Sequence, residues 1–106
     1  MPTPTIEIIS CLHAAVIVAD LDRSVEFYTG VLGLPRVDRS FNYPGAWYQI
    51  GDVQLHIIED RNYQAPAIDL TVSTRNPHIA FGVRDLDAAQ QRLTAANCVV
   101  KMSNSG

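Results

Sequence analysis

The sequence has 106 residues, enough for one domain with a core of its own. Hydrophobic residues make up 47% and charged residues 18%, a composition too apolar for a disordered chain. The net charge is −3 and the eight lysines and arginines are scattered, which argues against a nucleic-acid partner. The N-terminal residues have no signal peptide or membrane anchor, so we expect a cytoplasmic protein with no membrane partner. Cys11 and Cys98 lack metal-type spacing and are expected to be free, buried thiols.

The chain begins with a predicted strand and helix. Residues 11–19 are rich in valine, isoleucine, leucine and alanine, which is typical of a strand buried on both faces. Asp20 to Ser24 then supplies a turn and an N-cap, where acidic side chains suit the helix dipole. Gly33 and Pro35 end the helix. Its apolar face consists of Val25, Phe27, Tyr28, Val31 and Leu32.

Three more strands and a long polar stretch follow. Strands are predicted at residues 36–43, 46–50 and 53–59, the last two joined by a tight turn at Gly51-Asp52. Residues 11–59 therefore form a unit of strand, helix and three strands. Residues 60–77 are polar and are expected to link this unit to the next. This linker carries a weak apolar patch, Ile68, Leu70 and Val72.

The stretch at residues 13–22 occurs a second time at residues 78–87, 65 residues later. Both copies contain the leading histidine, an alanine two positions on, a valine and the triplet Asp-Leu-Asp, which is the signature of a duplicated unit. We therefore predict a strand at 78–83, a helix capped by Asp85 or Asp87, and a strand at 98–102. The final hairpin that would match residues 46–59 is missing. The inward face of this helix consists of Leu86, Ala89, Leu93 and Ala96.

Three motifs of this chain resemble those of a known family. They are His13-x-Ala-x-x-Val-x-Asp20-Leu21-x-x-Ser24-x-x-Phe27-Tyr28-x-x-Val31-Leu32-Gly33, Gln54-Leu55-His56-Ile57-Ile58-Glu59, and His78-Ile79-Ala80-Phe81. The family that they resemble is the vicinal oxygen chelate superfamily, which includes glyoxalase I, extradiol dioxygenases, methylmalonyl-CoA epimerase, and fosfomycin and bleomycin resistance proteins. The resemblance implies an α+β fold of paired βαβββ modules around a metal site. One glyoxalase-like domain, residues 1–106, would then hold module one at 11–59, a linker at 60–77 and an incomplete module two at 78–106.

The resemblance also implies a set of metal ligands. His13 and His78 resemble the first-strand ligands of the two modules, and His56 resembles the last-strand ligand of module one. The fourth position falls in the missing hairpin, so water, another chain or a C-terminal extension would supply it, or the site would be incomplete. Imidazole ligands favour a divalent transition metal over Mg or Ca, and we expect Zn, Ni, Co, Fe or Mn.

Residues around the histidines independently favour a ligand site. Ala15 and Ala80 follow their histidines on the same strand face, and such small residues leave a hollow that a packed barrel interior would fill. Trp47 and Tyr48 are candidate pocket residues together with these alanines, although aromatic residues on a hairpin more often pack. Glu59 lies on the opposite strand face from His56, so it is expected at a solvated strand end rather than as a base.

Two functional hypotheses follow. The first is a metal-dependent enzyme that chelates the vicinal oxygens of a small-molecule substrate and stabilises an oxyanion, with lyase, isomerase or epimerase chemistry favoured over dioxygenase chemistry. The alternative is a metal-free small-molecule binding or sequestration protein of the bleomycin-resistance type, or an inactive truncated member. Because the missing hairpin leaves the strand at 98–102 with an open edge, we expect a homodimer whose chains complete each other's sheets.

Overall fold

The structure is a computed structural model, and it describes residues 3–38, 42–67 and 76–101. The chain divides into two compact units, Met1–Tyr63 and Gln64–Gly106. The boundary between them falls inside the stretch that the sequence predicts as a linker. The predicted apolar patch of that linker lies outside the described residues.

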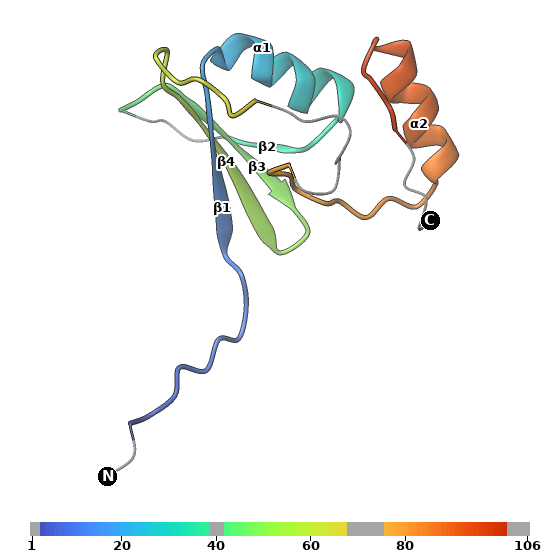
Figure 1. The fold of residues 1–106 in the computed structure, drawn as a ribbon. Coiled ribbons are helices and arrows are strands. Elements are labelled where there is room, and N and C mark those ends of the chain that lie inside the picture. The colour runs from blue at the N-terminus through green and yellow to red at the C-terminus, as the bar shows by residue number, and fades with distance from the viewer. Residues whose placement is uncertain (1–2, 39–41, 68–75, 102–106) are drawn as a thin grey trace. The chain divides into compact units, whose positions relative to one another are not determined.

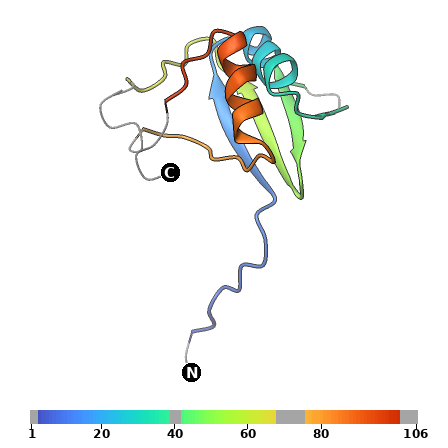
Figure 2. The same ribbon diagram turned by 90° about the vertical axis from the view of Figure 1, so that its right-hand side faces the viewer.

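The first unit is a four-stranded sheet with a helix across one face (Figures 1 and 2). The strand order is β1-β4-β3-β2; β1 runs parallel to β4, and the other neighbours are antiparallel. This is the predicted unit of one strand, one helix and three strands. Its elements are β1 (His13–Val18), α1 (Leu21–Val25), the π-helical segment η1 (Glu26–Val31), β2 (Arg36–Val37), β3 (Gly45–Ile50) and β4 (Val53–Glu59).

The helix begins at the predicted cap. Asp20 has an extended backbone, and its Oδ1 accepts a hydrogen bond from the backbone N–H of Arg23 at 3.1 Å. This bond satisfies one of the amides that a helix start leaves without an intrahelical partner. After Val25 the helix widens into η1, which no pattern in the sequence predicts.

The helix ends just before Gly33. Gly33 has a φ of +68°, a left-handed conformation that side chains other than glycine rarely adopt. The chain turns back there, and the backbone N–H of Leu34 donates to the carbonyl of Tyr28 at 3.0 Å. The predicted end of the helix is therefore confirmed, and the next strand starts at Arg36.

The core of the first unit lies between this helix and the facing side of the sheet. Tyr48 and Ile57 are completely buried, and the Tyr48 hydroxyl forms a hydrogen bond with Thr29 Oγ1 in η1 at 2.9 Å. Burial, together with the nearby Tyr48, raises the pKa of Tyr28. The buried residues are Ala46, Tyr48, Leu55 and Ile57, and the partly buried residues packed against them are Val16, Val18, Leu21, Val25, Tyr28, Leu34 and Ile50.

β1 is less buried than predicted. The composition of residues 11–19 predicts burial on both faces, but Ile17 is 45% exposed and His13 is exposed. β1 stands at one end of the strand order, and within the first unit only its helix-facing side lies against the core. The residues before β1 form an extended arm (Figure 1), in which Ile6, Ile8, Ile9 and Leu12 are between 73% and 89% exposed.

Of the predicted strand at 36–43, only Arg36–Val37 is a strand among the described residues, and residues 39–41 lie outside them. The antiparallel partner of this short strand is β3, with Val37 beside Trp47. The following hairpin matches its prediction closely, because β3 begins at Gly45 and β4 spans Val53–Glu59.

The second unit contains one described helix, α2 (Leu86–Ala95), drawn in orange in Figure 1. The predicted cap is confirmed, because Asp85 Oδ1 accepts from the backbone N–H of Ala88 at 3.0 Å. Leu86 is 58% exposed, so its predicted inward position is wrong. No helix among residues 3–38, 42–67 and 76–101 is long and apolar enough to cross a membrane.

The predicted strands of the second unit are not formed in its described residues. Residues 78–83 and 98–101 have no strand conformation. An extended segment becomes a strand only when a neighbour takes up its backbone hydrogen bonds, and none of the described residues pairs with either segment. The alternation of apolar residues is therefore not sufficient for a strand here.

Substitutions of two isoleucines on adjacent strands test the position of the core. Ile57→Ala is expected to lower the free energy of unfolding by about 2 to 5 kcal/mol, because it empties a fully buried position. Ile17→Ala, the same change on a half-exposed side chain, is expected to cost less than about 1 kcal/mol. Urea unfolding of the full chain followed by Trp47 fluorescence measures both. Equal losses in the two variants would contradict the assigned core.

Candidate functional site

The face of the sheet away from the helix carries the candidate residues. Side chains alternate along a strand, so the neighbours of the core residues in sequence point to this second face. We call it the histidine face and define it as His13, Ala15, Trp47, Gln49, Gln54 and His56. The cross-strand register agrees with this assignment, since His56 stands beside both Ala15 and Trp47, and Gln54 stands beside both His13 and Gln49.

Three aromatic rings on this face form a continuous stack. The His56 ring lies against the Trp47 indole, with ring centres 3.7 Å apart and planes 7° from parallel. On its other side it lies against the His13 ring, with centres 4.2 Å apart and planes 16° from parallel. His56 is consequently only 7% exposed, whereas His13 at the sheet edge is exposed. The stack crosses β3, β4 and β1.

The small side chain of Ala15 explains how His13 reaches His56. The direct register partner of His56 on β1 is Ala15, and His13 is the diagonal neighbour. Diagonal neighbours on adjacent strands are within reach of aromatic side chains when the residue between them is small. The hollow that the sequence predicts beside Ala15 is thus occupied by the His13 ring.

Two glutamines complete the histidine face, and the sequence interpretation missed them. Gln49 Nε2 donates to the carbonyl of Gly51 at 2.7 Å, and Gln54 Nε2 donates to Gln49 Oε1 at 3.2 Å. Gln54 Oε1 lies 3.0 Å from His56 Nε2. The strand alternation already indicated that both glutamines lie on this face. Gln54 precedes His56 by two positions, and Gln49 stands opposite Gln54 across the hairpin.

His78 and Ala80 belong to the second unit. Both residues are exposed and lie outside any helix or strand. His78 Nδ1 is 2.6 Å from the carbonyl oxygen of Asn76, and because a carbonyl only accepts, Nδ1 carries a proton and donates. The structure thus brings together His13 and His56 of the predicted ligands, while the place of His78 beside them stays a prediction.

Tyr48 does not belong to the histidine face. It is fully buried on the opposite, helix-facing side, next to Leu55, and its hydroxyl is engaged by Thr29. Its predicted place in a substrate pocket is therefore wrong, because the hairpin alternation assigns Trp47 and Tyr48 to opposite faces. Trp47 remains on the histidine face and is half-buried.

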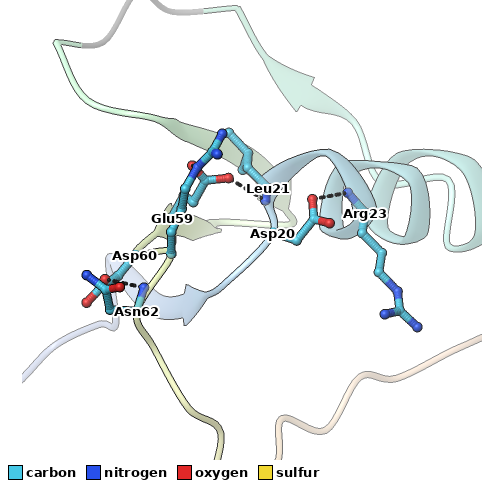
Figure 3. A network of polar contacts seen from close by, with 7 residues as sticks. Asp20, Leu21, Arg23, Glu59, Asp60 and Asn62 are labelled. Carbon is cyan, nitrogen blue, oxygen red and sulfur yellow. Dashed lines mark hydrogen bonds and ion pairs between the residues drawn. The ribbon is translucent and has the colours of Figure 1, made fainter.

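Glu59 is a structural residue at the end of β4. Its Oε2 accepts a hydrogen bond from the backbone N–H of Leu21 at 2.8 Å (Figure 3). Its Oε1 lies 3.2 Å from Arg61 Nε. The Glu59 side chain is only 11% exposed, so the expected solvated strand end is wrong. The Leu21 N–H bond holds the pKa of Glu59 below its ordinary value; Arg61 acts in the same direction, and burial opposes them.

No group of three histidine, cysteine, aspartate or glutamate side chains is close enough to hold a metal ion among residues 3–38, 42–67 and 76–101. Two stacked imidazoles direct their in-plane lone pairs side by side rather than at one point, so His13 and His56 as they stand do not chelate one ion together. His13 alone, as an exposed imidazole, fits a transition metal. Cys11 and Cys98 are free thiols, as predicted, but Cys11 is exposed and Cys98 is half-buried, so their predicted burial is wrong.

Comparison with known proteins identifies the family. Residues 10–105 match the family model described as Glyoxalase/Bleomycin resistance protein/Dioxygenase superfamily. The chain belongs to this superfamily. A probable lactoylglutathione lyase of Vibrio cholerae is 32% identical over 93 residues, covering 84% of this chain and 67% of that protein. A protein of the same name from Vibrio parahaemolyticus is 30% identical, covering 80% and 64%, so the chain spans about two thirds of the length of these relatives.

Solved structures of the superfamily have the same fold. A putative glyoxalase family protein from Bacillus anthracis has a TM-score of 0.69 at 19% identity, covering 89% of this chain and 75% of that one. A variant fosfomycin resistance protein from Listeria monocytogenes, complexed with Mn(II) and 1S,2S-dihydroxypropylphosphonic acid, has a TM-score of 0.66 at 17% identity, covering 92% and 73%. The predicted α+β glyoxalase-like fold is thereby confirmed.

The low pKa of Glu59 predicts a pH dependence of stability. A carboxyl group whose pKa is lower in the folded than in the unfolded chain stabilises the fold above its unfolded pKa, and this stabilisation is lost as the pH falls through the folded value. Glu59→Gln keeps an oxygen for Leu21 but lacks the charge. We expect its free energy of unfolding to fall less than that of the wild type between about pH 5 and about pH 3.

The control is Glu26→Gln, which removes an exposed glutamate at the start of η1. Urea unfolding at a series of pH values measures all three proteins. We expect the control to follow the wild-type profile. Parallel profiles for wild type and Glu59→Gln would show that the carboxylate charge does not stabilise the folded state.

Proposed function

We propose that this member of the glyoxalase superfamily is a metal-dependent enzyme that acts on a small molecule with two adjacent oxygen atoms. The observation that carries the proposal is the exposed His13 imidazole, held at the edge of the sheet against the buried His56 ring. A ligand held in one orientation before the metal arrives loses little freedom on binding it. Such a ring is a suitable donor for a divalent transition metal such as Zn, Ni, Co, Fe or Mn.

His78 is the second proposed ligand. Metal-bound histidines commonly donate their other ring N–H to a backbone carbonyl, which fixes the tautomer. His78 Nδ1 makes such a bond to the Asn76 carbonyl, so the lone pair of the neutral ring is on Nε2. The proposed ligand set is therefore His13 and His78; His56 is a third candidate only with its ring turned out of the stack on His13.

The chemistry follows from the superfamily and from this face of the sheet. A bound metal ion would act as a Lewis acid toward the two substrate oxygens. The His56 ring covers one face of the His13 ring. Lyase, isomerase or epimerase chemistry is favoured, supported by the lactoylglutathione lyase name of the Vibrio cholerae relative. The vicinal hydroxyls of the compound in the Listeria monocytogenes complex support the substrate class.

Metal binding is the first test of this function. Protein purified without chelator is expected to retain or take up a transition metal, measured by elemental analysis after dialysis. His13→Ala should reduce the affinity at least about tenfold, because it removes a ligand. Cys11→Ser, which removes an exposed thiol two residues away, is the control and should bind as the wild type does.

Absence of bound metal in the wild type after dialysis against Zn, Ni, Co, Fe and Mn would overturn the proposal. The metal-free binding function would then be preferred. Trp47, half-buried and stacked on His56, would report such binding through its fluorescence when candidate ligands are added. An unchanged signal together with a tightly held metal would argue against that second function.

The sheet edge at β1 leads us to propose a homodimer. In the described part of the first unit β1 pairs only with β4, and Ile17 and the preceding arm expose aliphatic side chains. Proteins usually cover or pair such an edge. Sedimentation equilibrium at tens of micromolar is expected to give a dimer mass, and a monomer throughout that range would contradict this assembly.

A further inference from the structure

The two glutamines of the histidine face form a directed chain of hydrogen bonds that ends at His56. It starts at the carbonyl of Gly51, passes through the side chains of Gln49 and Gln54, and reaches His56 Nε2. Its three donor-to-acceptor distances are 2.7, 3.2 and 3.0 Å. We call this chain the glutamine relay. Each amide has one accepting end and one donating end, so a relay of this kind has a direction.

The Gly51 carbonyl sets the direction of the glutamine relay. A backbone carbonyl can only accept, so the amide nitrogen of Gln49 must face it, and the amide oxygen of Gln49 then faces Gln54. The same reasoning makes Gln54 donate to Gln49 and turn its own oxygen to His56. Reversal of either amide would set oxygen against oxygen or N–H against N–H. The imidazole at the end of the relay therefore has to donate from Nε2.

The surroundings of His56 allow no other orientation of the ring without loss of contacts. Its faces are covered by Trp47 on one side and His13 on the other, with planes within 16° of parallel. A rotation of the ring out of its plane would break both stacks, whereas a half-turn about the Cβ–Cγ bond would keep the stacks but take Nε2 away from Gln54. The ring plane is thus held by the stack, and the position of Nε2 within that plane is held by Gln54.

We propose that Gln49 and Gln54 are positioning residues that hold the proton of His56 on Nε2. In the neutral ring the lone pair is then on Nδ1, so Nε2 does not serve as a metal ligand. The tautomer follows from the hydrogen bonds alone, whereas its role in the site rests on the proposed function. His78 is in the reverse state, since its Nδ1 donates to Asn76. His56 and His78 therefore carry the ring proton on different nitrogens.

The tautomer is tested first, in metal-free protein at a pH where the imidazoles are neutral. Two-dimensional NMR that correlates ring nitrogens with ring carbon-bound protons distinguishes a protonated from an unprotonated nitrogen, and a His56→Asn variant assigns the signals. We expect protonated Nε2 and unprotonated Nδ1 for His56. A protonated Nδ1 in the wild type would overturn the proposal.

Because free histidine also favours the Nε2–H form, matched variants are needed. Gln49→Leu removes the group that orients Gln54, and the Nε2–H fraction of His56 is expected to fall. Gln49→Glu loses the bond to the Gly51 carbonyl but still accepts from Gln54, so it should keep the orientation of Gln54 and the wild-type tautomer of His56. If both variants keep the wild-type tautomer, the glutamine relay does not set it, and the proposal fails.

A second measurement, titration with Zn²⁺ alone, tests the role of the glutamine relay in the proposed metal site. Saturation with Zn²⁺ should leave the His56 Nε2–H signal in place, and its loss would overturn the proposal. The affinity for Zn²⁺ should fall about tenfold in Gln49→Leu, because a ligand loses its supporting hydrogen bonds, and it should be unchanged in Gln49→Glu. Equal Zn²⁺ affinities of Gln49→Leu and the wild type would overturn the positioning role. No Zn²⁺ binding at all would count against the proposed function, while the NMR result on metal-free protein would still decide the tautomer.

Discussion

The register of β4 with its two neighbours is the constraint on which the rest of the first unit depends. β4 pairs in parallel with β1 and antiparallel with β3, so its residues from Gln54 to Ile58 each have a register partner on both neighbouring strands. Ile57 stands between Val16 and Ala46 in the core, and a shift of one residue would move it to the other face. The tight turn after β3, with a φ of +56° at Gly51, fixes this register.

The same strand also anchors the start of the helix. Glu59, the last residue of β4, binds the Leu21 N–H, and the N–H of the next residue, Asp60, donates to the Val18 carbonyl at 2.8 Å. Together with the Asp20 cap these bonds take up polar groups at the turn from β1 to α1. The helix is therefore held at its first turn by a strand 38 residues later in the chain, and the core forms beneath it.

Local signals predicted most of the first unit. The bounds of β4, the Asp20 cap and the end of the helix at Gly33 follow from alternation, capping chemistry and glycine, which all act within a few residues. The role of Glu59 and the burial of Tyr48 depend on contacts between distant segments, which a single sequence does not reveal. The same holds for the candidate site. The sequence indicated its histidines, but the hydrogen bonds of the glutamine relay became visible only from the register of the hairpin.

The contrast between His56 and His78 shows what repetition in a sequence can and cannot establish. The duplicated stretch identifies His13 and His78 as equivalent positions, but the state of an imidazole depends on the acceptor nearest to it. At His78 that acceptor is a backbone carbonyl beside Nδ1, and at His56 it is an amide oxygen beside Nε2. A ligand set carried over from a family is therefore incomplete until the protonated nitrogen of each histidine is known. Here the two glutamines determine which ring nitrogen of His56 carries the proton.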